Sequence, residues 1–116
     1  MNDVCRMIKK QTVTNFSNME TAIKTYDRNA SVCGTPAWRY VYHAIHSADK
    51  WFFNPSKFTE PDFHENGMDN PDNPCNVVLS DTELLDYLHK VQIKTENYLD
   101  NLSDEELNEK PQGCEY

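Results

Sequence analysis

Glycine is scarce in this chain: only three occur in 116 residues, and they are far apart. The sequence therefore has no glycine-rich loop of the kind that cradles phosphate groups. It also lacks the G-x-S-x-G setting of a hydrolase nucleophile. Neither phosphoryl transfer through a phosphate-binding loop nor serine-based acyl transfer is supported by the residues.

Long apolar runs and an excess of positive charge are missing too. No apolar run approaches the roughly 20 residues that span a bilayer, and the N-terminus has no hydrophobic signal region. We therefore expect no membrane segment and a cytoplasmic location. The formal net charge is −8, from 11 Lys and Arg against 19 Asp and Glu. Because binding to a phosphate backbone needs a basic patch, this charge argues against a nucleic-acid partner.

The four cysteines show no paired spacing. Cys5, Cys33, Cys75 and Cys114 are far apart in the sequence, and none belongs to a C-x-x-C pair. A zinc site built on cysteines needs such pairs. The missing signal region and the helical pattern favour free thiols over two disulfides.

The apolar residues that are present recur at helical spacing over three stretches. They predict helices at about residues 2–27, 35–53 and 80–102, with a short helix at 103–110. A proline-rich loop at 54–79 separates the second and third helices. At this length the chain forms one domain, which we predict to be all-α.

Helix starts are indicated by capping residues. Thr35 followed by Pro36 reads as an N-cap with proline at the first helical position. Ser80 with Glu83 forms a capping box, and residues 103–106 repeat that pattern. The third helix also has apolar positions that step by four and three, which indicates a bundle seam. These positions are Leu84, Leu88, Val91, Thr95, Tyr98 and Leu102.

The length of the loop at 54–79 has a topological meaning. A helix of about 19 residues is roughly 28 Å long. An antiparallel neighbour would need only a short turn, whereas a parallel neighbour needs a crossover along the whole helix. We therefore expect the second and third helices to run in the same direction.

Polar groups within the second helix are the most informative feature of the sequence. His43, His46 and Asp49 follow one another at three-residue steps, so they share one ridge of the helix. Imidazole and carboxylate groups are good ligands for zinc, nickel, iron or manganese. The alternative is that His46 and Asp49 form hydrogen bonds inside a packed bundle while His43 faces solvent.

A helical wheel ranks these side chains by distance from the apolar stripe of the second helix. The stripe contains Trp38, Val41, Ile45 and Phe52. Asp49 lies at its margin, His46 further out and His43 furthest. His64 in the long loop and His89 on the third helix are expected to be solvated.

With these residues in place, the chain resembles the DinB-like superfamily of four-helix bundles, also described as DinB/YfiT-like metalloenzymes. The resemblance covers residues 38–53, the loop from 54 to 64, the third helix and residues 109–114. Its most specific part is Tyr42-His43 followed by Asp49-Lys50-Trp51-Phe52. It implies an up-down-down-up bundle with a long crossover between the second and third helices.

The resemblance also implies a divalent metal held by three histidines. By its spacing to Trp51, His43 matches the ligand on the second helix, with His46 as the competitor. The other two ligands form an H-x-x-x-H pair on a fourth helix, and this sequence contains no such pair. We therefore expect three helices of the bundle and an incomplete metal site.

Two functions remain open from the sequence. The resemblance implies membership of a divalent-metal-dependent enzyme family that transfers low-molecular-weight thiols. The alternative is a non-enzymatic helical interaction module. In either case three helices without a fourth would expose apolar surface, so we expect a homodimer.

Overall fold

The computed structural model describes residues 3–51 and 58–101. The elements in chain order are α1 (Asp3–Thr25), β1 (Ser31–Val32), β2 (Thr35–Pro36), α2 (Ala37–Trp51) and α3 (Asp81–Asp100). This mostly helical architecture agrees with the all-α prediction, to which it adds a small antiparallel hairpin of β1 and β2. No helix in the described part is long and apolar enough to cross a membrane.

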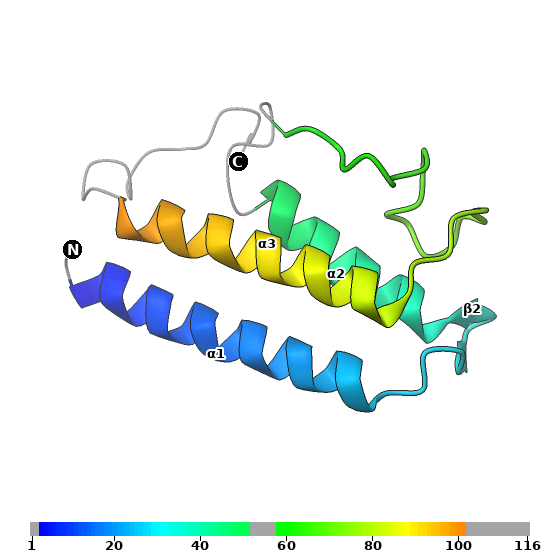
Figure 1. Cartoon of the computed structure of the whole chain (residues 1–116), viewed down its shortest axis with the longest axis horizontal. Coiled ribbons are helices and arrows are strands. Elements are labelled where there is room, and N and C mark those ends of the chain that lie inside the picture. The colour runs from blue at the N-terminus through cyan, green and yellow to red at the C-terminus, as the bar shows by residue number, and fades with distance from the viewer. Residues whose placement is uncertain (1–2, 52–57, 102–116) are drawn as a thin grey trace.

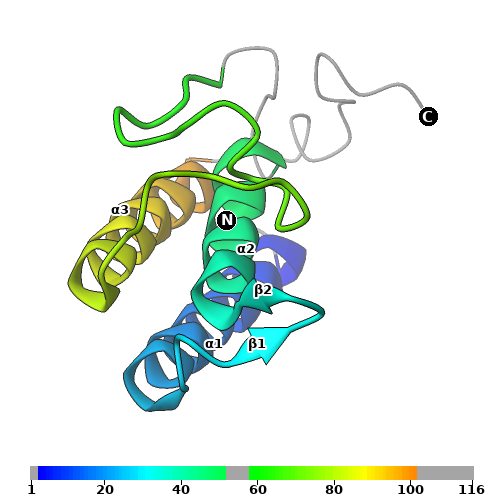
Figure 2. The same cartoon turned by 90° about the vertical axis from the view of Figure 1, so that its right-hand side faces the viewer.

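The helices α2 and α3 run in the same direction, and α1 runs opposite to both (Figure 1). Lys9 near the start of α1 forms an ion pair with Asp100 at the end of α3. At the other end of α1, the Tyr26 hydroxyl donates to Asp81 over 2.9 Å. The parallel pair agrees with the expectation from the loop length. In the end view, the loop arches over α2 and α3 on the side away from α1 (Figure 2).

The start of α3 is the predicted capping box. The Glu83 amide donates to the Ser80 hydroxyl, and the Ser80 amide donates to the Glu83 carboxylate, both over 3.1 Å. The predicted seam is buried up to its last turn, where Leu99 replaces Tyr98 in the core and Tyr98 is 39% exposed. A straight α-helix has 3.6 residues per turn, so the four-residue step from Val91 to Thr95 is followed by another, from Thr95 to Leu99.

The predicted N-cap at Thr35 is wrong, because α2 begins two residues later. Thr35 belongs to the hairpin, and its hydroxyl donates to the Pro71 carbonyl over 3.0 Å. Backbone carbonyls of the preceding segment take the place of a side-chain cap. The Ala37 amide donates to the Ala30 carbonyl over 2.9 Å.

A tight turn at Cys33 and Gly34 closes the hairpin. Both residues have positive φ, of 52° and 82°. This conformation is that of a two-residue type I′ turn, whose twist matches paired strands. The sequence pattern around Gly34 was too short to predict the hairpin, because each strand has only two residues.

The core joins all three helices and the loop. It contains Phe16, Ile23, Trp38, Tyr42, Ile45, Met68, Leu79, Leu84, Tyr87, Leu88 and Val91. Met68 and Leu79 come from the loop, and both are almost fully buried. The loop is therefore packed into the molecule and can hold side chains in fixed positions.

Some predictions fall outside the described residues. These are the short helix at 103–110, its capping box at 103–106, the seam position Leu102, the stripe residue Phe52, and the side chains of Cys5 and Cys114. The described cysteines Cys33 and Cys75 are free thiols, in agreement with the prediction made for them.

Candidate metal centre

The polar side chains of α2 meet the loop that follows it. Arg39, Tyr42, His43 and His46 lie at steps of three, one and three residues, on one face of the helix. Each of them contacts an atom of residues 60–70. The polar groups of this helix thus converge on the loop.

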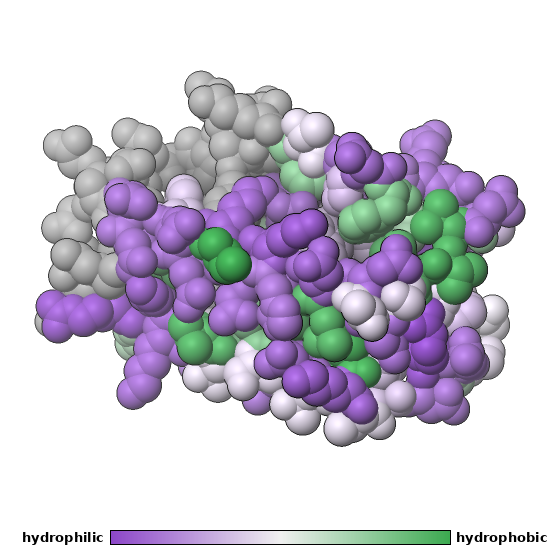
Figure 3. All heavy atoms as spheres, in the orientation of Figure 1, coloured by the Kyte–Doolittle hydropathy of each residue, from purple (hydrophilic) through white to green (hydrophobic). Residues whose placement is uncertain are grey.

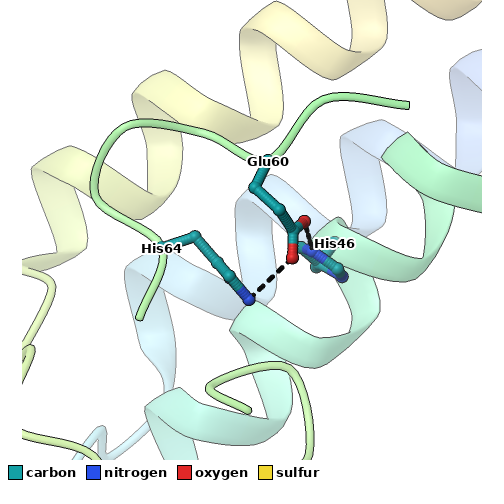
Figure 4. A group of neighbouring side chains, drawn as sticks. All are labelled: His46, Glu60 and His64. Atoms are coloured by element: carbon teal, nitrogen blue, oxygen red, sulfur yellow. Dashed lines mark hydrogen bonds and ion pairs between the residues drawn. The ribbon is translucent and has the colours of Figure 1, made fainter. Parts of the chain in front are cut away.

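At the centre of this contact, one carboxylate lies between two imidazoles. His46 Nε2 is 2.7 Å from Glu60 Oε1, and His64 Nε2 is 2.8 Å from Glu60 Oε2. Figure 4 shows His46 on α2, with Glu60 and His64 reaching it from the loop. One ligand atom of each residue lies within 4.8 Å of the other two. These three residues could hold a metal ion, and they are called the His-Glu-His group below.

The two histidines are buried and the glutamate reaches outward. The side chains of His46 and His64 are 3% and 4% exposed, whereas that of Glu60 is 46% exposed. The imidazole rings stack with centroids 4.8 Å apart, and the Phe58 ring packs edge-on against His46 at 5.3 Å. Two ligand atoms therefore belong to buried imidazoles packed against aromatic rings, and the third belongs to a half-exposed carboxylate.

The Tyr42 hydroxyl contacts the ring nitrogen of His64 that faces away from Glu60. The hydroxyl oxygen is 2.5 Å from His64 Nδ1, and the tyrosine is fully buried. Burial raises the pKa of the Tyr42 phenol well above its ordinary value, and the charge of Glu60 raises it further. A neutral phenol can donate to Nδ1 or accept from it, so Tyr42 can serve either tautomer of His64.

A second polar group adjoins the first. Asp49 Oδ1 is 2.6 Å from Lys94 Nζ, and the Tyr87 hydroxyl donates to Asp49 Oδ2 over 2.8 Å. Burial and then this hydrogen bond raise the pKa of the Tyr87 phenol. Asp49 is thus engaged with α3 and lies outside the His-Glu-His group.

An open cavity of about 430 Å³ lies between the loop and α3. Glu60 and Phe63 line it from the loop, and Tyr87 and Lys94 line it from α3. Glu60 is the residue that this cavity shares with the His-Glu-His group. A small molecule in the cavity would therefore meet the group from the carboxylate side.

The structure places only one of the three predicted metal ligands in the His-Glu-His group. His46 belongs to the group, whereas Asp49 does not. His43 is exposed, and its Nδ1 is 2.6 Å from the Asp69 carbonyl. This placement follows the helical wheel rather than the spacing to Trp51. The assignment of His43 as a ligand depends on the H-x-x-x-H pair, so it stays a prediction.

The structure contradicts the predicted exposure of one of the two remaining histidines and agrees with that of the other. His64 was expected to be solvated, and that expectation is wrong because the loop folds over α2 and inserts the ring between Tyr42 and Glu60. His89 is exposed, as expected, and is 2.9 Å from Glu20.

Glu60 was missed by reasoning from the sequence. The loop contains it in the run Glu60-Pro61-Asp62-Phe63-His64, where glutamate and histidine are four residues apart. A turn in which the His64 amide donates to the Pro61 carbonyl brings the two side chains together. The spacing E-x-x-x-H was the signal that could have identified the pair.

Comparisons with protein-family models, with curated proteins and with solved structures found no match for this chain.

Proposed function

We propose that this protein binds a divalent metal ion through His46, Glu60 and His64. The observation that carries the proposal is the approach of three ligand atoms to within 4.8 Å of one another, two of them on buried imidazoles. Two histidines and one carboxylate are the ligand set of catalytic zinc sites and of non-haem iron(II) sites. Zinc and iron are therefore favoured over nickel and manganese.

Metal binding would require these ligand atoms, which lie within 4.8 Å of one another, to move to tetrahedral separations. Four-coordinate zinc holds its ligand atoms at about 2.0–2.2 Å, which places neighbouring ligand atoms roughly 3.4 Å apart. Glu60 lies 2.7 and 2.8 Å from the two imidazoles. The carboxylate would have to withdraw by roughly 0.6–0.7 Å, and its half-exposed side chain has the freedom to do so.

The surrounding residues support chemistry at such a centre. A metal with three protein ligands keeps an open coordination position, at which it acidifies a bound water or thiol. Phe58 and Tyr42 shield the imidazoles from water, and the Tyr42 hydroxyl can accept the Nδ1 proton of His64 when Nε2 binds a metal. The cavity beside Glu60 has room for a small molecule. A low-molecular-weight thiol as substrate, a DinB-like relationship and a cytoplasmic location stay predictions from the sequence.

Metal titration of the chelator-treated protein tests the proposal. We expect one zinc or iron(II) ion per chain, with the affinity reduced by about tenfold or more in His46→Ala, His64→Ala and Glu60→Gln. Glu60→Gln changes only a half-exposed side chain, so it reports on the metal even where a histidine variant fails to fold. His89→Ala is the matched control and keeps the wild-type affinity.

Two results would overturn the proposal. One is the absence of stoichiometric binding, and the other is equal loss of affinity in His89→Ala. Loss of metal affinity in His43→Ala alone would assign the site to His43, the histidine that the DinB-like resemblance implies.

We propose an interaction module as the second candidate function. A groove of about 250 Å³ between α1 and α2 is lined almost entirely by carbon atoms. Its lining residues are Met19, Ala22, Ile23, Tyr40, Val41 and Ala44. An apolar groove of this kind favours association, and a second copy of the chain is the partner expected from the sequence.

A further inference from the structure

A second cavity lies beside the N-terminus of α2, and none of its lining residues belongs to the His-Glu-His group. Its volume is about 370 Å³. The hairpin and the first turn of α2 form one wall, and residues 71–75 with Val78 form the other. Most of its lining is apolar, from Trp38, prolines and Val78, with one cationic side chain, Arg39, and one anionic side chain, Asp72.

Arg39 is the unusual residue of this cavity, because its charge is buried. Only 4% of the residue is exposed. Its Nη2 donates to the carbonyl oxygens of Met68 and Asn70, each over 3.0 Å. Its Nε is buried and has no hydrogen-bond partner among the described residues. Within residues 3–51 and 58–101, no carboxylate forms an ion pair with this guanidinium.

A buried guanidinium of this kind needs a counter-ion. Charged side chains are almost never fully buried unless they are paired, because desolvation of the ion is costly. The two carbonyls satisfy hydrogen bonds but carry no net charge. The Trp38 ring, 5.8 Å from the guanidinium carbon, supplies only a weak cation–π contact. The charge of Arg39 therefore calls for an anion that the described residues do not provide.

We propose that this cavity binds the carboxylate group of a small organic molecule, with Arg39 as its counter-ion. The planar guanidinium matches a planar carboxylate. One cation faces the cavity and Asp72 opposes further negative charge, so a monoanion fits better than a phosphate dianion. Trp38, the prolines and Val78 would contact the apolar body of the same molecule. This proposal is independent of metal binding.

The competing partner for Arg39 is the chain's own Asp72. Asp72 is exposed and lines the same cavity, so a rotation of its side chain could pair the two charges. The test therefore has to separate a bound carboxylate from an internal ion pair.

Titration with benzoate, followed by NMR of the full chain, makes this separation. We expect saturable shifts of the Arg39 Nε–H and Trp38 indole signals with benzoate. Neutral benzamide, which has the same shape, should leave both signals in place. Benzamide shifts equal to those from benzoate, or inorganic phosphate binding at least as tightly as benzoate, would overturn the proposal.

Three exposed positions supply variants that leave Arg39 and its loop contacts intact. Val78→Glu places a negative charge at the cavity and should weaken benzoate binding about two- to fivefold. Ile93→Glu adds the same charge on α3 at a similarly exposed position and should leave binding unchanged. Asp72→Asn removes the opposing charge and should strengthen binding by a similar factor. Equal binding in the two glutamate variants, or a shifted Arg39 Nε–H signal and lower stability in ligand-free Asp72→Asn, would overturn the proposal.

Discussion

Tyr42 joins the core of this protein to its candidate metal centre. The residue is fully buried, its ring lies 5.9 Å from that of Tyr87, and its hydroxyl contacts His64 Nδ1. An outer partner of this kind accepts the proton of the ring nitrogen that does not bind the metal, here Nδ1, and so orients the imidazole. The phenol thus links packing of the hydrophobic core to geometry at the ligand.

Replacement of Tyr42 by phenylalanine isolates that hydroxyl. It keeps the ring but leaves His64 Nδ1 without its partner, so we expect zinc affinity to fall by about tenfold and stability by about 1 kcal/mol. Isothermal titration and urea unfolding measure the two quantities. Tyr40→Phe is the matched control, because in the described part of the chain the Tyr40 hydroxyl donates only to the exposed Val32 carbonyl. Wild-type zinc affinity in Tyr42→Phe would contradict the role given to the hydroxyl.

At this scale the sequence predicted one of the three residues of the group. His46 was a candidate because helical spacing can be read from the sequence, and the wheel placed it closer to the core than His43. Glu60 and His64 were missed because the path of an irregular loop depends on contacts far apart in the sequence. Helical periodicity says nothing about those contacts.

The loop from residue 58 to 79 is the element on which the candidate centre depends. Successive turns shape it, with the amides of Met68 and Asn73 donating to the carbonyls of Glu65 and Asn70. Gly67 stands within these turns at a φ of 81°, and its carbonyl accepts from the Asn73 side chain over 3.2 Å. A positive φ favours glycine, since a Cβ is strained there.

Gly67→Ala tests whether this loop conformation supports metal binding. A Cβ at Gly67 would lie 3.0 Å from Asn73 Nδ2, in addition to the backbone strain. We expect a loss of about 1–2 kcal/mol in stability together with weaker zinc binding, because Glu60 and His64 lie on the same loop. Gly34 also has a positive φ, but a Cβ added there would have no described atom within 4 Å. Gly34→Ala should therefore lower stability while zinc affinity stays at the wild-type value. Equal zinc affinity in both variants would show that the loop conformation at Gly67 does not support metal binding.

The start of α3 is a separate and more local element. Ser80→Ala removes the side-chain acceptor of the Glu83 amide, and we expect a loss of about 1 kcal/mol in urea unfolding. Ser17→Ala, at an exposed position inside α1, should change stability by less than about 0.5 kcal/mol. A similar loss in both variants would contradict the cap.

Element boundaries could be predicted where the cap is a side chain. The Ser80 and Glu83 box has a readable sequence pattern, and the structure has it. The start of α2 does not, because its first amides bond backbone carbonyls at Arg28 and Ala30, which any residue could supply.

At the scale of the whole molecule, two features are the polar face in Figure 3 and the raised phenol pKa values of two tyrosines. The face in Figure 3 is mostly hydrophilic, with apolar side chains in small separate groups. Burial and a hydrogen bond with Asp81 raise the pKa of Tyr26 above the ordinary 10.0, and burial and a hydrogen bond with Asp49 raise that of Tyr87.

The mostly helical fold and the parallel α2–α3 pair could be predicted from periodicity and loop length, which are global properties of the sequence.

The raised tyrosine pKa values predict a loss of stability in alkali. Above pH 10 the unfolded chain releases the phenolic protons of Tyr26 and Tyr87 while the folded chain retains them, so the unfolding free energy falls as pH rises. Urea unfolding at a series of alkaline pH values measures the effect. Tyr87→Phe should reduce the slope above pH 10. A slope that is identical in the variant would contradict the assigned cause.

The oligomeric state tests the groove between α1 and α2. If two copies meet there, Ala44→Glu places an exposed charge at the interface, and light scattering should show a wild-type dimer and a variant monomer. Ile93→Glu is the control, with the same added charge on α3. A monomeric wild-type protein would contradict the expected homodimer.

The central claim is that His46, Glu60 and His64 bind one metal ion, and X-ray absorption of the zinc-loaded protein tests it most directly. We predict nitrogen and oxygen ligands at about 2.0–2.1 Å, with scattering from two imidazoles that falls to one in His64→Ala. Sulfur ligands at about 2.3 Å, or an imidazole count that His64→Ala leaves unchanged, would contradict the account.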